Sequence, residues 1–509
     1  MRGRRSTKAG AAACALAALL ASTIAGVSGA ATPCPSEIDD AAFSGTAELL
    51  ADNQVMSDLG RRPTGSAAQT AWIDWLDAQL QGIAGLDAGL DVESVPYMVN
   101  RWDEGVLSLE AGPSSSALSA VEPSGFVPYA KPTLAGGVTA QLKYVAAGTA
   151  LAGQDIAGKI VVRDAVPGTV PFAAFRAVEW FEWDPDLTLI KDIASNYERD
   201  FAGYLQRVAD LKDAAAEGAA ALIFVHGFPR EQVRDQYAPY EGLHWDVPAL
   251  YVGVDEGEAL KGLAASGGVA HVSLSASDAS TVTRTLIATL PGASEERMVI
   301  ESHTDGMNAV WDNGPVGILA LARYFAALPV ACRPRTLQFV FTTGHLYQHL
   351  LGTEDRGGGA ELEAQQLDKD YDDGTLAMVF AMEHLGAREY AAVPRAGAPG
   401  RELVQTGRNE VNTIFVGETP VLIAAVDTAV LKRDLRRTFV MRGADAPAAF
   451  IPPHQSYGGE GGAYQQHLIP TIALVTGPWS LYNPAFGMEA IDGALMRTQT
   501  LLFADLIND

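Results

Sequence analysis

The chain has 509 residues, of which 48% are hydrophobic and 19% are charged, and its formal net charge is −25. This length and apolar content predict an ordered globular protein with two or more hydrophobic cores. The strongly negative charge argues against nucleic acid and anionic membrane surfaces as partners.

The first 30 residues have the pattern of a secretory signal peptide. Basic residues at positions 2, 4, 5 and 8 precede an apolar run over 11–25, and small residues follow at 28–31. We expect cleavage near residue 30 and a secreted mature protein with a formal charge of about −29. No later apolar run approaches the length of a membrane span, which argues against membrane insertion. The pair Arg4-Arg5 permits twin-arginine export, but the residues that follow leave the export route open.

Two cysteines remain after such a cleavage, Cys34 and Cys332. In an oxidising compartment they could form a disulfide that tethers the N-terminus to the main domain. Their spacing alone does not show that they meet.

The rest of the chain divides into three regions by its secondary-structure pattern. Residues 38–120 open with helical spacing, and residues 121–277 change to strand-like segments separated by Gly and Pro. From residue 285 to 509, apolar strand-like runs alternate with polar loops and helical runs. The clearest strands are predicted over 285–290, 298–300, 337–341 and 376–381. This alternation predicts an α/β fold, with a mixed, mainly parallel sheet and helices on both faces.

The most informative stretch covers residues 298–324. A short apolar run predicts a buried strand, a loop rich in turn residues follows, and a helical run comes after the loop. The loop contains His303, Asp305 and Asp312. Because ligands bind at the carboxyl ends of strands in open α/β sheets, these side chains are well placed to hold a metal ion.

This stretch resembles the co-catalytic zinc aminopeptidases, a family that includes bacterial leucyl aminopeptidase, glutamate carboxypeptidase and the non-catalytic transferrin receptor. In that family a strand ends in His-x-Asp, and an Asp in the following loop bridges two zinc ions. The resemblance implies that His303 is a zinc ligand. It implies that Asp305 belongs to the catalytic site and that its carboxylate orients the His303 ring. It also implies that Asp312, in Trp311-Asp312-Asn313-Gly314, is the bridging ligand.

Residues 121–277 resemble the protease-associated domain, which members of this family insert near the N-terminus. The matching features are a Gly-Lys-Ile-Val strand at 158–161, an alanine-rich helix before a strand at 222–225, and a Val-Pro-x-Leu strand at 247–250. The resemblance implies a small β-rich lid or substrate-binding module. The aromatic segment Phe172–Tyr204 is predicted as an insertion within it, either a recognition surface or a group of packing side chains.

The chain departs from the family in the loop after the strand predicted at 337–341. Family members carry two glutamates there, a general base and a zinc ligand. Aligning on the run Leu-Leu-Gly-Thr that ends this loop places Leu346 and Tyr347 at these positions, and a shift of one residue places His345 and Leu346 there. His345 could replace the missing general base. Alternatively, His345 and His349 could form a metal-binding pair on one helix face, or be structural histidines.

Two further positions determine how many zinc ions the resemblance implies. Glu383 keeps a carboxylate ligand, but Asn483 stands where the family has its last histidine ligand. One zinc site would keep His303, Asp312 and Glu383, and the second would keep Asp312 alone. The resemblance therefore implies one zinc ion or none. Candidates for the substrate pocket are Tyr457, Glu460 and Asn483.

Two functions follow from these patterns. The first is a secreted metallopeptidase of aminopeptidase type, a hydrolase that cleaves peptide or related amide bonds with one zinc ion. The second is a pseudoenzyme that keeps the peptidase fold as an extracellular binding module. The set His303, Asp305, Asp312 and Glu383 favours proteolysis, whereas the missing base and ligands favour the pseudoenzyme. A serine hydrolase is disfavoured because the chain has no Gly-x-Ser-x-Gly motif.

Overall fold

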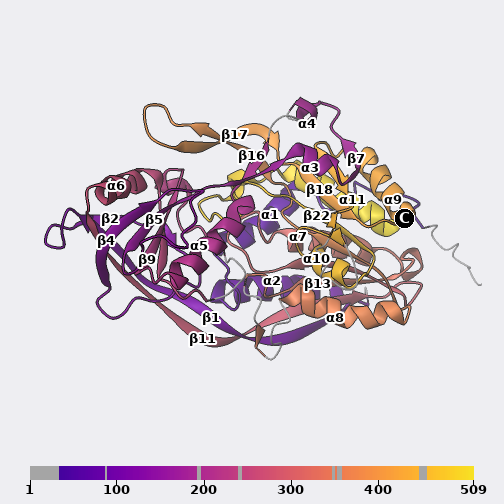
Figure 1. Ribbon diagram of the computed structural model, residues 1–509. Helices are drawn as coiled ribbons and strands as arrows, with labels where there is room; N and C mark the ends of the chain where they lie inside the picture. Colours follow the sequence, from indigo (N-terminus) through magenta and orange to yellow (C-terminus); the bar gives the residue numbers. More distant parts are fainter. Residues whose placement is uncertain are drawn as a thin grey trace, which may run out of the picture. The chain divides into compact units, whose positions relative to one another are not determined.

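The computed structural model describes most of the chain after residue 33 (Figure 1). The described residues are 34–85, 89–191, 196–238, 244–346, 350–351, 358–445 and 455–509. Residues 35–509 form one compact unit. The signal peptide predicted over residues 1–30 lies outside the described residues. Cys34 and Cys332 are both disulfide-bonded.

Four parallel strands form the centre of the main sheet, and the predicted α/β fold with a mixed, mainly parallel sheet is confirmed (Figure 1). In spatial order they are β13 (Thr336–Thr342), β12 (Arg297–His303), β15 (Leu376–Met382) and β22 (Thr471–Val475). Almost every residue in them is buried. Near-continuous apolar runs are what parallel strands need, because helices cover both of their faces.

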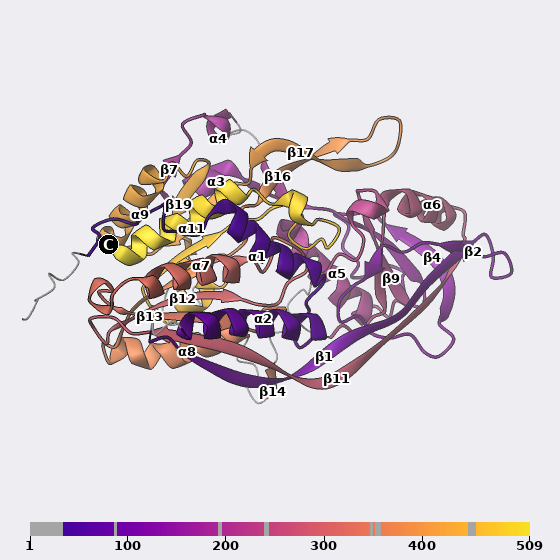
Figure 2. The same cartoon turned by 180° about the vertical axis from the view of Figure 1, so that it is seen from behind.

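Two hydrophobic cores lie on opposite faces of these strands. Successive side chains of a strand point to opposite faces, so Met298 and Ile300 contact one core while Val299 contacts the other. The first core is covered by α1 (Thr46–Asp58), α2 (Ala67–Ala84), α7 (Gly314–Ala327), α9 (Pro420–Lys432) and α11 (Gly493–Asn508). Figure 2 shows α1, α2, α7 and α11 in front of the sheet. The second core is covered by α8 (Gly359–Asp372) and α10 (Gly461–Gln466).

Local sequence signals set where the helices near the site begin. The side chain of Ser66 accepts a hydrogen bond from the backbone N–H of Gln69 and so caps the start of α2. Helix α7 has a proline in its first turn, where a missing N–H costs nothing. The start of α7 ends the loop that follows β12, and the turn before α2 contacts that loop through a bridge between Arg62 and Gly306.

The main sheet is extended on both sides of its parallel centre. On one side β11 (Val269–Leu290) pairs antiparallel with β13. On the other side the order is β18 (Asn412–Val416), antiparallel to β22, then β19 (Thr438–Met441), and last β7 (Glu179–Trp183), antiparallel to β19. The edge strand β7 therefore comes from the middle region of the sequence and joins the sheet of the C-terminal region.

A second group of parallel strands is built from the middle region. Strand β11 pairs along its length with β1 (Asp91–Gly112), and its first residues pair with β4 (Val138–Val145). Beyond β4 lie β5 (Ile160–Ala165), β9 (Ala221–His226), β10 (Ala249–Val252) and the short β3 (Gly125–Phe126). Helices α5 (Tyr204–Ala216) and α6 (Val254–Ala265) pack on this group. Identification of this region as a protease-associated domain stays a prediction.

The aromatic segment predicted as an insertion packs against the C-terminal region. We call residues 168–201 the bridging segment; its described elements are β6 (Gly168–Pro171), α3 (Phe172–Arg176), β7, α4 (Thr188–Lys191) and β8 (Asn196–Arg199). Phe172 and Tyr197 share a core with Phe439 of β19. Arg199 forms a buried ion pair with Glu410 at 2.6 Å. These contacts hold the bridging segment beside the end of the main sheet.

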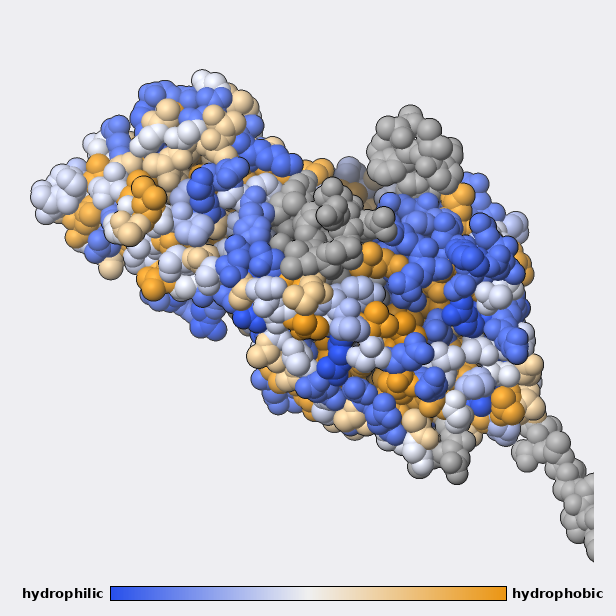
Figure 3. Space-filling view, turned by 90° about the horizontal axis from the view of Figure 1, so that it is seen from below, coloured by the Kyte–Doolittle hydropathy of each residue, from blue (hydrophilic) through white to orange (hydrophobic). Residues whose placement is uncertain are grey.

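The surface that Figure 3 shows is largely hydrophilic over the described residues, with apolar residues in small scattered groups. That distribution is typical of a surface in contact with water. Among the described residues, no helix is both long and apolar enough to span a membrane.

One buried carboxyl gives a pH-dependent stability prediction. Burial raises the pKa of Glu363 in α8 to about 7, whereas a solvated glutamate titrates near pH 4.3. The stability associated with its neutral form is thus present below about pH 4.3 and is lost as pH rises through about 7. We expect Glu363→Gln to stabilise the protein by about 4 kcal/mol at pH 8 and to have little effect at pH 4. Urea unfolding at both pH values tests this, with the exposed Glu93→Gln as the control.

Candidate metal centre

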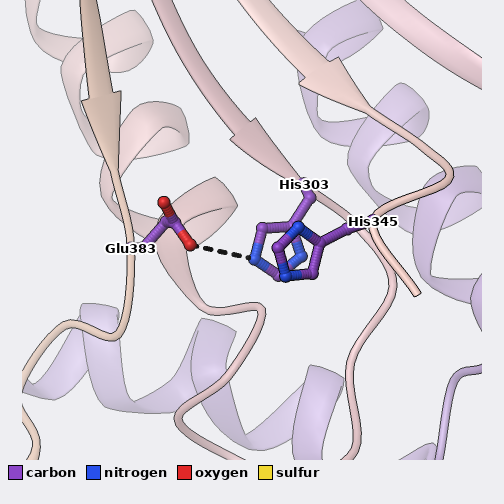
Figure 4. A group of neighbouring side chains, drawn as sticks. All are labelled: His303, His345 and Glu383. Carbon is purple, nitrogen blue, oxygen red and sulfur yellow. Dashed lines mark ion pairs between the residues drawn. The ribbon is translucent and has the colours of Figure 1, made fainter. Parts of the chain in front are cut away.

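Three polar side chains meet where the parallel strands end. His303 is the last residue of β12, Glu383 directly follows β15, and His345 lies in the loop after β13. Neighbouring parallel strands place their carboxyl ends at one edge of the sheet, so the fold itself brings these residues together. Each side chain offers one ligand atom, and the three atoms lie within 4.8 Å of one another (Figure 4).

His303 is oriented so that one ring nitrogen is available to a ligand. Its Nδ1 lies 2.9 Å from the backbone oxygen of Asp305 and donates to it, which leaves the lone pair on Nε2. This Nε2 lies 3.6 Å from Oε2 of Glu383, the contact drawn in Figure 4. Both atoms are buried and have no hydrogen-bond partner.

His345 stacks on His303 and is held by a hydrogen bond to Glu460. The two imidazole rings lie 3.9 Å apart between centroids, with planes inclined by 13°. Nδ1 of His345 is hydrogen-bonded to the carboxylate of Glu460. The backbone N–H of Glu460 also donates to Oε1 of Glu383 at 2.6 Å. Glu460 therefore holds two of the three side chains, while Oε2 of Glu383 faces Nε2 of His303.

The donor set and spacing fit a zinc ion. Zinc in proteins is bound by histidine nitrogens and carboxylate oxygens at about 2.0–2.2 Å, so tetrahedral ligand atoms lie roughly 3.3 Å apart. The separation of 3.6 Å between His303 and Glu383 is close to that value. Three protein ligands with an open fourth position are also the usual composition of a catalytic zinc site.

A fourth side chain, His384, lies beside the cluster. Its backbone has a positive φ of 56°, a conformation uncommon outside glycine, which turns the residue away from the strand direction of β15. Nδ1 lies 2.5 Å from the backbone oxygen of Thr476. Nε2 lies 3.6 Å from Oε2 of Glu383 and is buried without a hydrogen-bond partner. His384 thus presents a free lone pair on the same side as the candidate ligands.

Burial and mutual attraction determine the charges in this cluster. Burial disfavours the charged form of His303, but the attraction of Glu383 and of further carboxylates outweighs it and raises the pKa of His303 to about 10. Burial also opposes the charge on Glu383, but the neighbouring histidines lower its pKa to about 2. Burial lowers the pKa of His384 to about 4, so this imidazole is neutral at pH 7. Without a bound cation, His303 and Glu383 therefore carry opposite charges at neutral pH, and a metal ion that binds Nε2 of His303 would displace the proton from that nitrogen.

Asp312, predicted as the bridging ligand, lies in a different environment. Both of its carboxylate oxygens accept hydrogen bonds from Arg62, at 2.5 and 2.7 Å, and both side chains are fully buried. Arg62 also donates to the backbone oxygens of Met56 and Asn308. A Cβ on Gly306 would lie 2.2 Å from Oδ1 of Asp312, so only glycine leaves room for this arrangement. Its negative charge is already balanced by a guanidinium, which does not support the ligand role predicted for Asp312.

Asp305 acts on the site differently from the way the sequence suggested. Its backbone oxygen, and not its carboxylate, orients the His303 ring. The carboxylate Oδ2 accepts hydrogen bonds from the hydroxyl of Thr64 at 2.5 Å and from the backbone N–H of Leu346 at 2.8 Å. Asp305 thereby ties the loop that carries His345 to the loop that carries His303.

The three predicted pocket residues are distributed around the site. Glu460 contacts His345 and Glu383, as described above. Tyr457 is buried, stacks on Phe415 with a centroid distance of 5.2 Å, and lines a groove next to the cluster. Asn483 donates to the backbone oxygen of Gln232 and accepts from the N–H of Ala485, so it joins two loops instead of facing the cluster. Tyr347 and His349 lie outside the described residues.

Sequence reasoning missed two residues of this site, His384 and Arg62. The position of His384 directly after Glu383 was a usable signal, because both follow the end of a strand. Arg62 belongs to the turn between α1 and α2, and no sequence pattern indicates that it pairs with an aspartate 250 positions later.

Two cavities meet at His345. The first encloses about 350 Å³, and His345, Glu383 and His384 line it together with mainly apolar side chains. The second is a polar groove of about 790 Å³. The two share the residues His345, Gly459 and Tyr482. The candidate centre therefore lies between an apolar cavity and a polar groove.

The comparisons with known proteins identify the fold. No family model and no curated protein matches the sequence. The aminopeptidase from Aneurinibacillus sp. strain AM-1 aligns with a TM-score of 0.54 and 17% identity, over 92% of this chain and 94% of that chain. The zinc aminopeptidase BSAP from Bacillus subtilis aligns with a TM-score of 0.61 and 14% identity, over 93% and 95%. The peptidase M28 precursor from Shewanella amazonensis SB2B aligns with a TM-score of 0.63 and 16% identity, over 92% and 93%. The chain therefore has a zinc-aminopeptidase-like fold, and its activity has to be argued from its own residues.

Proposed function

We propose that this protein is a secreted hydrolase of aminopeptidase type that cleaves peptide or related amide bonds with one zinc ion. The proposed ligands are His303, His345 and Glu383. The observation that carries the proposal is the convergence of their ligand atoms at the strand ends, with His303 Nε2 and Glu383 Oε2 buried 3.6 Å apart and without a hydrogen-bond partner. Buried polar atoms are otherwise nearly always paired, so this arrangement is what a ligand set requires. Secretion rests on the leader pattern of residues 1–30.

This ligand set differs from the sequence prediction at one position. His345 replaces Asp312, because Arg62 engages both carboxylate oxygens of Asp312. A second zinc ion would depend on Asp312 and on Asn483, and the side chain of Asn483 is bound to the backbone of two loops. These contacts favour one zinc ion.

Each proposed ligand is supported by a further contact. The backbone of Asp305 fixes His303, the Glu460 carboxylate fixes His345, and the Glu460 backbone fixes Glu383. Metal-binding histidines in proteins almost always donate their second nitrogen to a carbonyl or carboxylate, which sets the tautomer and the ring orientation. Both histidines here meet that requirement.

A zinc ion held by His303, His345 and Glu383 would supply a Lewis acid able to polarise a substrate carbonyl and acidify a water molecule. The chain supplies the proton transfer. Nδ1 of His384 donates to Thr476, so the lone pair on Nε2 faces Glu383 at the apolar cavity. We assign His384 as the general base, which accepts a proton from water and returns it to the leaving nitrogen. His345, the base suggested by the sequence, then serves as a ligand.

We expect His384→Asn to lower kcat by about 10²–10⁴-fold without changing the zinc content, because it removes the proton acceptor and leaves all three ligands in place. The assay uses the zinc-loaded full chain on a panel of aminoacyl and acyl anilides. His271→Asn is the matched control, because His271 lies in β11 and bonds to Thr139 of the second strand group. Full activity in His384→Asn would contradict the assignment.

A second candidate function, an extracellular binding module, is favoured by one observation. The buried Arg62–Asp312 ion pair removes a ligand that two-zinc hydrolysis would need. The panel of aminoacyl and acyl anilides separates the two functions. A binding module would turn over no substrate, whether or not it holds zinc.

A further inference from the structure

We propose that the apolar cavity beside His384 binds a bulky, uncharged acyl group, so that the substrate is an amide without a free amine next to the scissile bond. This inference rests on the proposed function for the hydrolytic reaction and departs from it in the substrate, because an aminopeptidase acts beside a free amine. The preference of the cavity can nevertheless be measured without turnover.

The bridging segment builds one wall of the cavity. Its contribution is Val170, Phe175, Tyr197 and Phe201, and the C-terminal region adds Val411, Phe415, Val475 and Leu481. Phe175 lies 5.5 Å from Tyr197 and 5.5 Å from Phe439 between ring centroids, so this wall is fixed by aromatic packing. The cavity of about 350 Å³ is at the small end of ligand sites and suits one aromatic or branched aliphatic group.

The charges around the cavity argue against a substrate ammonium group. Among the described residues that line it, Glu383 alone is acidic, and it is a proposed metal ligand. The carboxylate of Glu460 is engaged by His345. A further carboxylate, Glu410, lies behind Tyr197 and Val411. It is fully buried, accepts from Arg199 at 2.6 and 2.7 Å, and accepts from the backbone N–H of Val411 at 2.9 Å. An ammonium group in the cavity would lose its water without gaining a free counter-charge, which is unfavourable.

The polar groove is the proposed binding site for the amine portion of the substrate. Its lining includes Glu361, Gln365 and Gln466, and it meets the cavity at His345. A substrate that spans both would place its acyl group in the cavity, its amide bond beside His345 and His384, and its polar amine portion in the groove.

The first test compares two amides that differ only in the amine. Phenylpropanamide is neutral, and phenylalaninamide carries a protonated α-amino group at about pH 6.5. Calorimetry on the zinc-loaded full chain should show phenylpropanamide binding at least about tenfold more tightly. Equal or tighter binding of phenylalaninamide would overturn the inference.

The second test changes the wall. Phe175→Ala should weaken phenylpropanamide binding by at least about tenfold, because it removes an aromatic contact surface. Trp180→Ala is the control, since Trp180 lies in the same segment, is 38% exposed and does not line the cavity. Phe175→Leu tests the same wall if the alanine variant does not fold. Unchanged binding in a folded Phe175 variant would place the ligand elsewhere and overturn the inference.

Turnover of the matching p-nitroanilides separates this inference from the proposed function. Faster hydrolysis of the phenylpropanoyl compound than of the phenylalanyl compound supports both. Preference for the phenylalanyl compound supports the hydrolase and overturns the inference. If neither compound is hydrolysed but the binding preference holds, the hydrolase is contradicted and the cavity still selects a neutral apolar group.

Discussion

Arg62→Met should destabilise the protein by about 3–5 kcal/mol, because it leaves the Asp312 carboxylate buried without a counter-charge. Arg62 and Asp312 are fully buried and joined by two short hydrogen bonds, so neither charge can regain water in the folded state. Urea unfolding of the full chain measures the loss. The effect is among the largest that a single substitution is expected to have in this protein.

The double variant Arg62→Met/Asp312→Leu is the matched control. Replacing both members of a buried ion pair by apolar residues is often neutral or stabilising, so this variant should recover most of the stability. Addition of zinc distinguishes the two roles of Asp312. If Asp312 were a metal ligand, zinc would supply the missing positive charge and restore the stability of the Arg62→Met variant. We expect zinc to leave the stability of this variant unchanged. A loss below about 1 kcal/mol in Arg62→Met would contradict the ion-pair account.

His345→Ala should abolish zinc binding in the concentration range where the wild type is saturated, because it removes one of three proposed ligands. Glu460→Gln should have a smaller effect, about 10–100-fold in affinity, since Glu460 contacts the ligands and not the ion. Competition with a fluorescent zinc chelator gives both affinities. Equal affinities in His345→Ala and the wild type would mean that His345 is not a ligand, and His345 would return to the role of general base.

The features that follow from one strand and its own loop were accessible in the sequence. His303 lies three residues after a buried apolar run and Glu383 directly follows another, so the α/β pattern was enough to place them at one edge of the sheet. The same pattern predicted three of the four central strands, β12, β13 and β15, and the helices on both faces, and the structure confirms this architecture; β22 was not predicted.

The features that depend on distant pairing were not accessible. Asp312 was assigned a metal role on the family resemblance, because nothing in its neighbourhood indicated that Arg62 contacts it from a turn between two helices. The sequence pattern places the bridging segment in the middle region, yet its strand β7 pairs with β19, where Trp183 lies opposite Thr438. Such pairings depend on the packing of the whole chain, and local patterns do not encode them.

The position of His345 shows an intermediate case. The sequence offered two alignment registers and left three roles open, because the loop after β13 has lost the glutamates that would fix the register. Two contacts in the structure, the stacking on His303 and the hydrogen bond to Glu460, are the basis of the ligand role proposed for His345. Neither contact follows from the loop sequence alone.

Zinc content per chain, measured by elemental analysis after reconstitution and removal of loose metal, tests the central claim most directly. We predict one zinc ion in the wild type and in Arg62→Met/Asp312→Leu, and none in His345→Ala. Two zinc ions in the wild type, or loss of zinc in the double variant together with its retention in His345→Ala, would contradict the proposed centre.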